Sequence, residues 1–353
     1  MGYNTKIPNL LHKAVKIGLY ELSSTKNKEN MLEQNLNKEA RQNQETGLSS
    51  NTDLSNSRIF NKNGEANIQT KGSARWGRLN IYHSLLSMSN WKFLATILLF
   101  FIGINLFFAS IYLLIGLDHL SGMEAAVTNG EKFGEAFFFS AQTFTTVGYG
   151  RINPVGFSAS LTASLEALVG LMSFALATGL LYGRFARPRA YIKYSNNAVF
   201  APFKDGMALM FRMVPYTKNY LVNVEVKITL VLRMEEEGQW KNKFYDLPLE
   251  VSKANTMTAN WTIVHVINEL SPLHQFKKAD IAAAKAELLV FVQGFDESFS
   301  NTVISRTSYF FEEFIYGAKF VPMFHPNASN TRTVLYIDRL NDFVTAELPF
   351  QFN

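Results

Sequence analysis

Two long apolar segments interrupt an otherwise mixed pattern of polar and hydrophobic positions. Residues 93–116 carry no charged side chain, and residues 155–183 carry one, Glu166. A helix of about 24 residues is about 36 Å long, enough to cross the roughly 30 Å hydrocarbon core of a bilayer. The pattern therefore predicts two transmembrane helices, over residues 93–116 and 155–185.

A third, shorter apolar segment covers residues 133–144, between the two spans. Its length of about 12 residues is too short to cross a bilayer, and such a helix is typical of a re-entrant pore helix. It runs directly into residues 145–150, a loop that contains Gly148 and Gly150. The expected membrane domain, residues 93–188, is two spans that enclose this short helix and loop.

The charges beside the spans indicate their orientation. The loop from Leu117 to Glu135 has four acidic residues but one base, Lys132. Basic residues precede the first span and follow the second: Lys71, Arg75, Arg78, Lys92, Arg184, Arg187, Arg189 and Lys193. Because basic flanks stay in the cytoplasm, both termini are expected inside the cell and the loop outside.

The N-terminal part is polar and divides near residue 57. Residues 1–56 are rich in Asn, Lys, Glu, Gln and Ser, which predicts a disordered tail because little apolar surface is available for burial. Within residues 57–92, apolar positions recur at helical spacing from Asn80 to Trp91. This pattern favours a short interfacial helix in the plane of the membrane. The alternative is the first turn of the span itself.

Beyond Pro188 the hydrophobic pattern has a period of two. From Leu221 to Leu232, apolar side chains alternate with polar ones, which predicts a half-buried strand. Similar runs occupy Trp261–Val266, Ala286–Val292, Val303–Tyr309 and Thr331–Asp338. Short strands without a long helical pattern predict an all-β sandwich over residues 189–353.

Composition excludes several classes of protein. With 47% hydrophobic and 18% charged residues, the chain suits a membrane part joined to a soluble part. It has no cysteine, which excludes disulfides and thiolate metal sites. The net charge of +5 is modest, and no nucleic-acid partner is expected. Because His83, His265 and His274 lack metal-ligand spacing and no phosphate-binding glycine loop is present, we expect no enzyme and no organic cofactor.

The loop Thr146-Val147-Gly148-Tyr149-Gly150 carries the chemistry. This five-residue motif is known from the selectivity filters of potassium channels, and the assignment of the loop as a filter rests on that match. A dehydrated K⁺ ion needs cages of oxygen, which consecutive backbone carbonyls supply where glycines allow unusual dihedrals. One chain forms one side of such a cage, so a homotetramer that binds K⁺ ions is expected.

Several further motifs strengthen a resemblance to inward-rectifier potassium channels, most closely the prokaryotic KirBac branch. They are Ile81-Tyr82-His83, Leu165-Glu166-Ala167-Leu168 with Gly170, Arg184-Phe185-Ala186-Arg187-Pro188, Leu209-Met210-Phe211-Arg212, Asn260-Trp261-Thr262, Ser271-Pro272-Leu273 and Gly294-Phe295-Asp296-Glu297. The resemblance covers about residues 58–324. It implies passive K⁺ conduction across a bacterial inner membrane, with an immunoglobulin-like cytoplasmic domain that extends the pore.

One face of the second span is a candidate gate. Gly170, Phe174, Thr178 and Tyr182 are spaced by four residues and therefore share this face. If it lines the pore, Phe174 and Tyr182 form rings that close the pore by dewetting, and the resemblance implies that Tyr182 is the cytoplasmic constriction. Alternatively the aromatic rings pack against lipid or the first span. Gly170 is either a hinge or a contact point between helices.

Three polar residues are expected behind the filter. Glu166 is costly to bury within a span, so we expect it to hydrogen-bond to the filter or pore helix; a place near the headgroups is the alternative. Eukaryotic channels of the resembling family pair a Glu behind the filter with an Arg after it. Here these positions hold Gln142 and, one residue early, Arg151, so a hydrogen bond is expected rather than a salt bridge. Phe174 and Asn223 replace acids of those channels, so strong rectification is not expected.

Four basic residues at the inner membrane surface are candidates for binding anionic lipid headgroups and moving the gate: Lys92, Arg184, Arg187 and Arg189. Each base near anionic lipid gains about 1 kcal/mol. The alternative is that these charges only set the orientation of the spans.

Two other readings of the whole chain stay open. A potassium channel gated by a nucleotide- or calcium-binding domain predicts alternating strands and helices after residue 190. A membrane-anchored adhesion protein predicts a sandwich outside the cell and no ion flux.

Overall fold

The computed structural model describes residue 42 and residues 58–68, 81–123, 127–186, 188, 190–217, 221–236, 239–326 and 332–349. The chain divides into two compact units, Thr70–Arg187 and Met1–Gln69 with Pro188–Asn353, and each is described by itself. Of the predicted tail, residues 1–56, only Gln42 is among the described residues.

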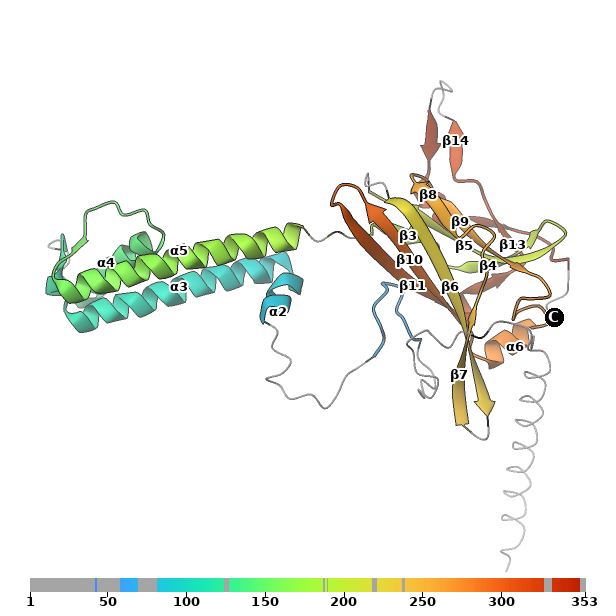
Figure 1. Cartoon of the computed structure of the whole chain (residues 1–353), viewed down its shortest axis with the longest axis horizontal. Coiled ribbons are helices and arrows are strands. Elements are labelled where there is room, and N and C mark those ends of the chain that lie inside the picture. Colours follow the sequence, from blue (N-terminus) through green and yellow to red (C-terminus); the bar gives the residue numbers. More distant parts are fainter. Residues whose placement is uncertain are drawn as a thin grey trace, which may run out of the picture. The chain divides into compact units, whose positions relative to one another are not determined.

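The first unit is helical. Its elements are α2 (Ile81–Ser87), α3 (Asn90–Ile115), the 3-10 turn η2 (Leu117–His119), α4 (Asn129–Phe144) and α5 (Phe157–Phe185). Helices α3 and α5 are long and apolar enough to cross a membrane. Figure 1 shows them side by side, with α4 at the opposite end of α3 from α2. The predicted architecture of two spans around a short helix is confirmed.

Helix α4 begins at Asn129, four residues before the predicted start. Thr128 and Glu131 form a capping box, in which the Glu131 N–H donates to Thr128 Oγ1 at 3.2 Å and the Thr128 N–H donates to Glu131 Oε2 at 3.0 Å. The apolar run alone could not show this polar first turn, although Thr-x-x-Glu is its known sequence signature.

A two-stranded clasp joins the segments on either side of α4 and its loop. Strands β1 (Leu120–Ser121) and β2 (Asn153–Pro154) pair antiparallel, so the segment before α4 is joined to the segment after the glycine-containing loop. The buried core of this end gathers side chains from α3, α4 and the clasp: Phe108, Ala109, Tyr112, Leu120, Ala136, Phe139 and Ile152.

The second unit is a β-sandwich. One sheet has the order β11-β10-β6-β7 with β8 beside β6, and the other has the order β12-β4-β5-β3 with β9 beside β5. Their bounds are β3 (Ile192–Tyr194), β4 (Ala198–Phe203), β5 (Gly206–Pro215), β6 (Leu221–Glu236), β7 (Gln239–Asp246), β8 (Lys253–Met257), β9 (Trp261–Ile267), β10 (Glu287–Asp296), β11 (Asn301–Phe310) and β12 (Phe314–Tyr316). The predicted sandwich is confirmed, and the alternative of alternating strands and helices is wrong.

The core of the sandwich follows the alternating pattern of the sequence. The apolar positions of β6 are buried from Val224 to Leu232, and the rings of Phe211 and Tyr309 meet across the two sheets at 5.3 Å. Asn223 lies at a β-bulge with φ of 49°. A short helix, α6 (Lys278–Ala283), and the 3-10 turn η3 (Phe311–Glu313) complete this part.

The C-terminal segment adds short pieces of structure outside the main sheets. They are β13 (Ala318–Phe320), β14 (Phe324–Pro326), β15 (Thr333–Leu335), η4 (Ile337–Asn341) and β16 (Phe343–Thr345). The strand predicted at Thr331–Asp338 is too long: the strand ends at Leu335, and Asp338 lies in the first turn of η4.

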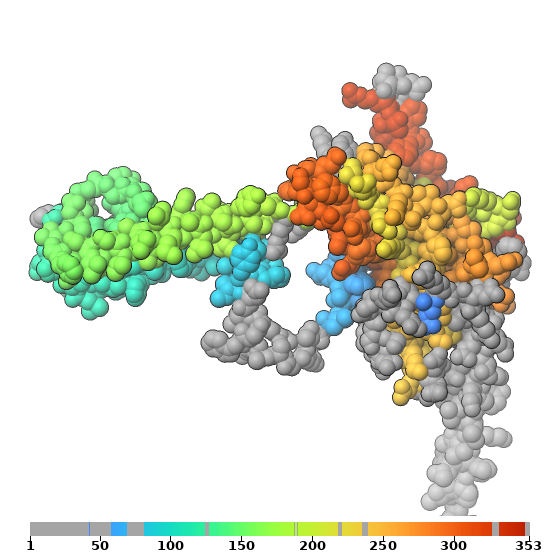
Figure 2. Space-filling view, in the orientation of Figure 1, coloured from blue at the N-terminus to red at the C-terminus, as the bar shows by residue number. Residues whose placement is uncertain are grey.

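An N-terminal strap, residues 58–68, packs on the sandwich, as Figure 2 shows by its light blue atoms beside the orange strands. The Ile59 side chain is buried against Val231, Phe244 and Leu289. Its N–H donates to the Glu287 carboxylate at 2.8 and 3.0 Å. Residues more than 220 positions apart are therefore held together.

Candidate functional site: the loop after helix α4 and its supports

Along the loop after α4, residues with positive φ alternate with residues that do not adopt it. Thr146, Gly148 and Gly150 have φ values of 60°, 52° and 84°, whereas Val147 and Tyr149 do not adopt positive φ. Such alternation turns successive peptide carbonyls toward one side. Thr146 is β-branched, and positive φ is strained for such a residue, so the surrounding structure must hold this conformation.

The end of α4 supplies that support. The N–H groups of Val147 and Gly148 both donate to the carbonyl oxygen of Gln142, at 2.9 and 3.3 Å. The Thr146 N–H donates to the Thr143 carbonyl at 3.0 Å. The last carbonyls of a helix have no partner within it, so the loop satisfies them. The backbone oxygen of Gln142 therefore holds the loop.

The C-terminal end of the loop is braced by an ion pair that the sequence reasoning missed. The Arg151 guanidinium bonds the Glu135 carboxylate of α4, not Gln142. The prediction of a hydrogen bond rather than a salt bridge at this brace is wrong. A cation gains more from a carboxylate than from an amide, and Glu135, two helical turns before Gln142, is within its reach. Asn153 Nδ2 also donates to the Gly150 carbonyl at 3.0 Å.

Behind α4, a fully buried carboxyl group joins three helices. Glu166 of α5 accepts a hydrogen bond from the Tyr112 hydroxyl of α3 at 2.7 Å and one from the Ser140 hydroxyl of α4. Ser140 Oγ also lies 2.9 Å from Asn105 Oδ1. Glu166 therefore lies against the short helix. Tyr112 was missed, because a tyrosine in an apolar run gives no signal of its own.

Gly170 lies where α5 touches the end of α4. A β-carbon at this position would overlap the carbonyl oxygen of Phe144. The close approach requires glycine, so the geometry favours the contact role of Gly170 over the hinge role. One turn further along the same face, Phe174 is 74% exposed, and Tyr182 is also 74% exposed.

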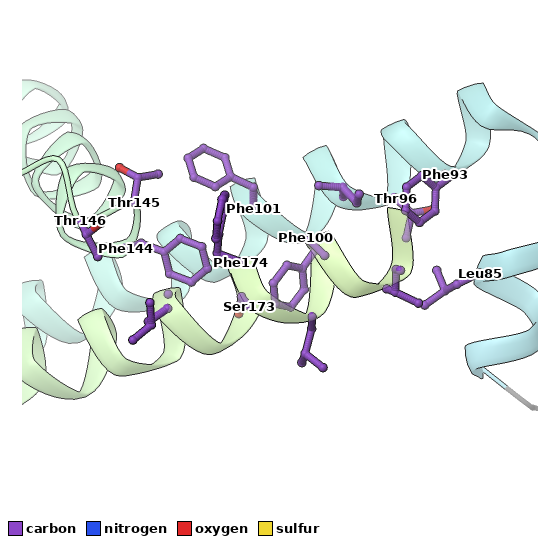
Figure 3. Close-up of a pocket in the computed structure, with 16 residues that line it drawn as sticks. Leu85, Phe93, Thr96, Phe100, Phe101, Phe144, Thr145, Thr146, Ser173 and Phe174 are labelled. Carbon is purple, nitrogen blue, oxygen red and sulfur yellow. The ribbon is translucent and has the colours of Figure 1, made fainter. Parts of the chain in front are cut away.

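A groove of about 560 Å³ runs between α3 and α5 beside the start of the loop. Figure 3 shows aromatic rings from three helices in it, including Phe101, Phe144 and Phe174. The rings of Phe101 and Phe144 pack edge to face with centroids 6.0 Å apart. Thr145 and Thr146 line the same groove. Phe174 therefore lies near the start of the loop.

The basic residues near the start of α3 and the end of α5 differ in their surroundings. Lys92 is exposed, and Arg187 and Arg189 lie outside the described residues. Arg184 donates hydrogen bonds to the carbonyls of Leu85 and Met88. Three N–H groups of its guanidinium are thus engaged by the chain itself.

Two spans, a short helix between them and a loop with alternating backbone hand define a pore-loop membrane protein. Sequence comparisons give the particular family. The model of the inward rectifier potassium channel C-terminal domain matches residues 192–351, and the ion channel model matches residues 100–186. The chain is 33% identical to the inward rectifier potassium channel Kirbac3.1 of Paramagnetospirillum magnetotacticum, over 76% of this chain and 89% of the relative.

More distant relatives come from mammals. The G protein-activated inward rectifier potassium channels 4 of Bos taurus and Mus musculus are each 28% identical, over 62% of this chain and 56% of theirs. The chain belongs to the inward rectifier potassium channel family, and the predicted resemblance to the KirBac branch is confirmed. Among solved structures, the sporulation control protein Spo0M of Bacillus subtilis aligns at 8% identity, over 36% of this chain and 50% of that one, with a TM-score of 0.21, which carries no argument.

Proposed function

We propose that four copies of this chain surround a potassium-selective pore, with residues 146–150 as its filter. The observation that carries this proposal is the alternation of positive φ at Thr146, Gly148 and Gly150. The carbonyl oxygens of this loop replace the water around a K⁺ ion, and the Thr146 hydroxyl adds a further oxygen at the inner end. Val147 and Tyr149 point away from the axis and brace the loop.

The supports of the filter act as positioning residues. Helix α4 directs its negative C-terminal end toward the inner mouth of the filter, where it favours a cation. The Gln142 carbonyl and the Arg151–Glu135 ion pair hold the two ends of the loop. Glu166 holds α4 between α3 and α5.

The gate lies on α5, with Phe174 and Tyr182 as apolar rings that close the pore by dewetting. Their high exposure in a single chain supports this role, because a pore surface has no partner within one subunit. Anionic lipids act at the inner surface through Lys92, Arg187 and Arg189. Both termini, the interfacial segment 57–92 and the β-sandwich face the cytoplasm of a bacterial cell.

Rubidium uptake into sealed liposomes tests the proposal. The purified protein should take up Rb⁺ against excess Na⁺, and Ba²⁺ should block the uptake. Gly148→Ala should abolish selectivity, since positive φ costs a residue with a β-carbon about 1–2 kcal/mol. Gly134→Ala is the matched control, because both glycines have open space around a β-carbon but Gly134 is helical. Equal passage of Na⁺ and Rb⁺ by the parent protein would refute the proposal.

A further inference from the structure

One residue of the N-terminal tail pairs with the last strand of a sheet. In the order β11-β10-β6-β7, β7 stands at the end, and it forms a long hairpin with β6 (Figure 1). Gln42 forms an antiparallel bridge with Tyr245 of β7. Because Tyr245 already pairs with Leu230 of β6, the bridge uses the other edge of β7. The end of a sheet is where a further strand can add by backbone pairing.

The N-terminal strap leads the chain to this edge. Phe244 and Tyr245 point to opposite faces of β7, as successive residues of a strand do, and each is 4% exposed. Tyr245 belongs to the core between the two sheets, whereas Phe244 packs against Ile59 of the strap. The chain that precedes the strap therefore starts beside the residue that Gln42 meets.

The link between Gln42 and the strap is long enough for both contacts. Residues 43–57 can extend over at most about 50 Å, far more than neighbouring positions of one strand require. Closing a loop of this length costs little more entropy than closing a shorter one. A segment tethered so near its site has a high effective concentration there, which favours β7 of the same chain over β7 of another copy.

We propose that residues 40–44 form an added strand on the edge of β7 away from β6, so that the polar tail extends a sheet of its own chain. The bridge at Gln42 sets an antiparallel register in which Arg41 falls opposite Asp246. Opposite charges at directly opposed positions stabilise a pair of strands. The added strand also covers an edge that strands of other molecules would otherwise join. This inference does not depend on the proposed pore.

A disulfide between opposed positions tests the register. The chain has no cysteine, so Arg41→Cys combined with Asp246→Cys gives two thiols per chain. Opposed residues of antiparallel strands have Cα atoms about 4.5–5.5 Å apart, a distance that a disulfide bridges. Under mild oxidation of the full-length protein, we expect most chains to lose both thiols. They should keep the mobility of a single chain in denaturing electrophoresis without reductant.

The matched control for the cross-link is Glu45→Cys combined with Asp246→Cys. In the proposed register these positions are offset by four residues, about 13 Å along the strand. This pair should therefore form a disulfide at least about tenfold more slowly than the opposed pair.

Hydrogen exchange tests the backbone pairing without a cross-link. Proline has no N–H and is poorly tolerated within a ladder, so Gln42→Pro should weaken the added strand. We expect exchange of the β7 amides, Gln239–Asp246, to become at least about fivefold faster. Gln34→Pro, the same substitution outside the proposed strand, is the matched control and should leave exchange in β7 unchanged.

Three results would overturn the proposal. Equal cross-linking of the two cysteine pairs would show that the tail passes β7 without a register. A cross-linked pair of chains in denaturing electrophoresis would assign the tail to β7 of another copy. Unchanged exchange of β7 in Gln42→Pro would show that no strand is added there. Should the cysteine variants fail to assemble, the exchange comparison decides by itself.

Discussion

The hydroxyl of Tyr112 donates a hydrogen bond to Glu166 Oε2 over 2.7 Å, and both side chains are buried. This bond ties α3 to α5. The other carboxyl oxygen bonds Ser140 of α4, so the short helix that carries the proposed filter is held by one acidic residue from behind. The position of the proposed filter therefore depends on side chains outside the loop itself.

Removal of the Glu166 carboxyl group should loosen the filter. In Glu166→Ala the hydroxyls of Tyr112 and Ser140 lose an acceptor, and each unsatisfied buried group costs about 1–3 kcal/mol. We expect a less heat-stable assembly and reduced Rb⁺ selectivity over Na⁺. Glu166→Gln keeps an acceptor for Tyr112 and a donor for Ser140, so it should stay near the parent. An alanine variant as stable and selective as the parent would show that the network is dispensable.

Gly170→Ala should separate α5 from the end of α4. The added methyl group would overlap the Phe144 carbonyl, and overpacking of this kind costs about 1–3 kcal/mol. We expect a loss of assembly or of rubidium uptake, measured by size-exclusion chromatography and flux. Gly179→Ala is the matched control, because open space surrounds a β-carbon at that position on the same helix. Normal assembly with altered gating in Gly170→Ala would favour a hinge instead.

The stability of the β-sandwich should fall in mild acid because of His265. Its ring is buried between the Pro248 carbonyl and Ser271 Oγ, and burial lowers the pKa of His265 to about 4. Above pH 6.5 the His265 ring is neutral in both the folded and the unfolded state, so its contribution to the free energy of unfolding is constant. As the pH falls from 6.5 toward 4, only the unfolded chain binds the proton, so folding weakens.

The expected loss is on the order of 2–3 kcal/mol between pH 7.5 and pH 4.5. It is measured by denaturant unfolding followed by tryptophan fluorescence, with Trp261 in β9 as a neighbouring reporter. Other groups titrate in this range, so the quantity compared is the difference between the parent and His265→Asn. A difference that does not change with pH would contradict the assignment.

The N-terminal strap should detach when Arg58 is truncated. The Arg58 guanidinium bonds the Glu313 carboxylate at 2.9 Å and the Ser308 carbonyl at 2.6 Å, with about a fifth of either ionised side chain exposed. Arg58→Ala should lower the free energy of unfolding by about 1–3 kcal/mol and expose residues 58–68 to protease.

An exposed ion pair of the same domain serves as the control for the strap. Lys204 and Glu250 lie 2.5 Å apart, but their side chains are 62% and 39% exposed. Because solvent screens such pairs, Lys204→Ala should change the free energy of unfolding by less than about 1 kcal/mol. Equal effects of the two variants would mean that the strap contacts add nothing beyond an ordinary surface pair.

Much of the architecture is readable from local pattern. The two spans, the short helix and the alternating strands follow from the pattern of hydrophobic positions over 10 to 30 residues. This pattern is a property of consecutive residues. The hydrophobic pattern missed the start of α4 at Asn129, because its signal is a polar capping box. The strand predicted at Thr331–Asp338 extends too far, because the chain enters a 3-10 turn after the strand ends. Such boundaries depend on single side chains rather than on a periodic pattern.

The sequence by itself determined the class of protein: two apolar spans, a glycine-containing loop of known type and a sandwich of alternating strands. Only the tertiary structure decided which side chains meet. Arg151 meets Glu135, Glu166 meets Tyr112, and Arg184 meets α2 rather than standing free. The physical reason is that the hydrophobic period and the backbone freedom of glycine are properties of adjacent residues. Hydrogen-bond partners depend instead on how the helices cross. The partners in these three contacts lie 16 to 99 positions apart in the sequence.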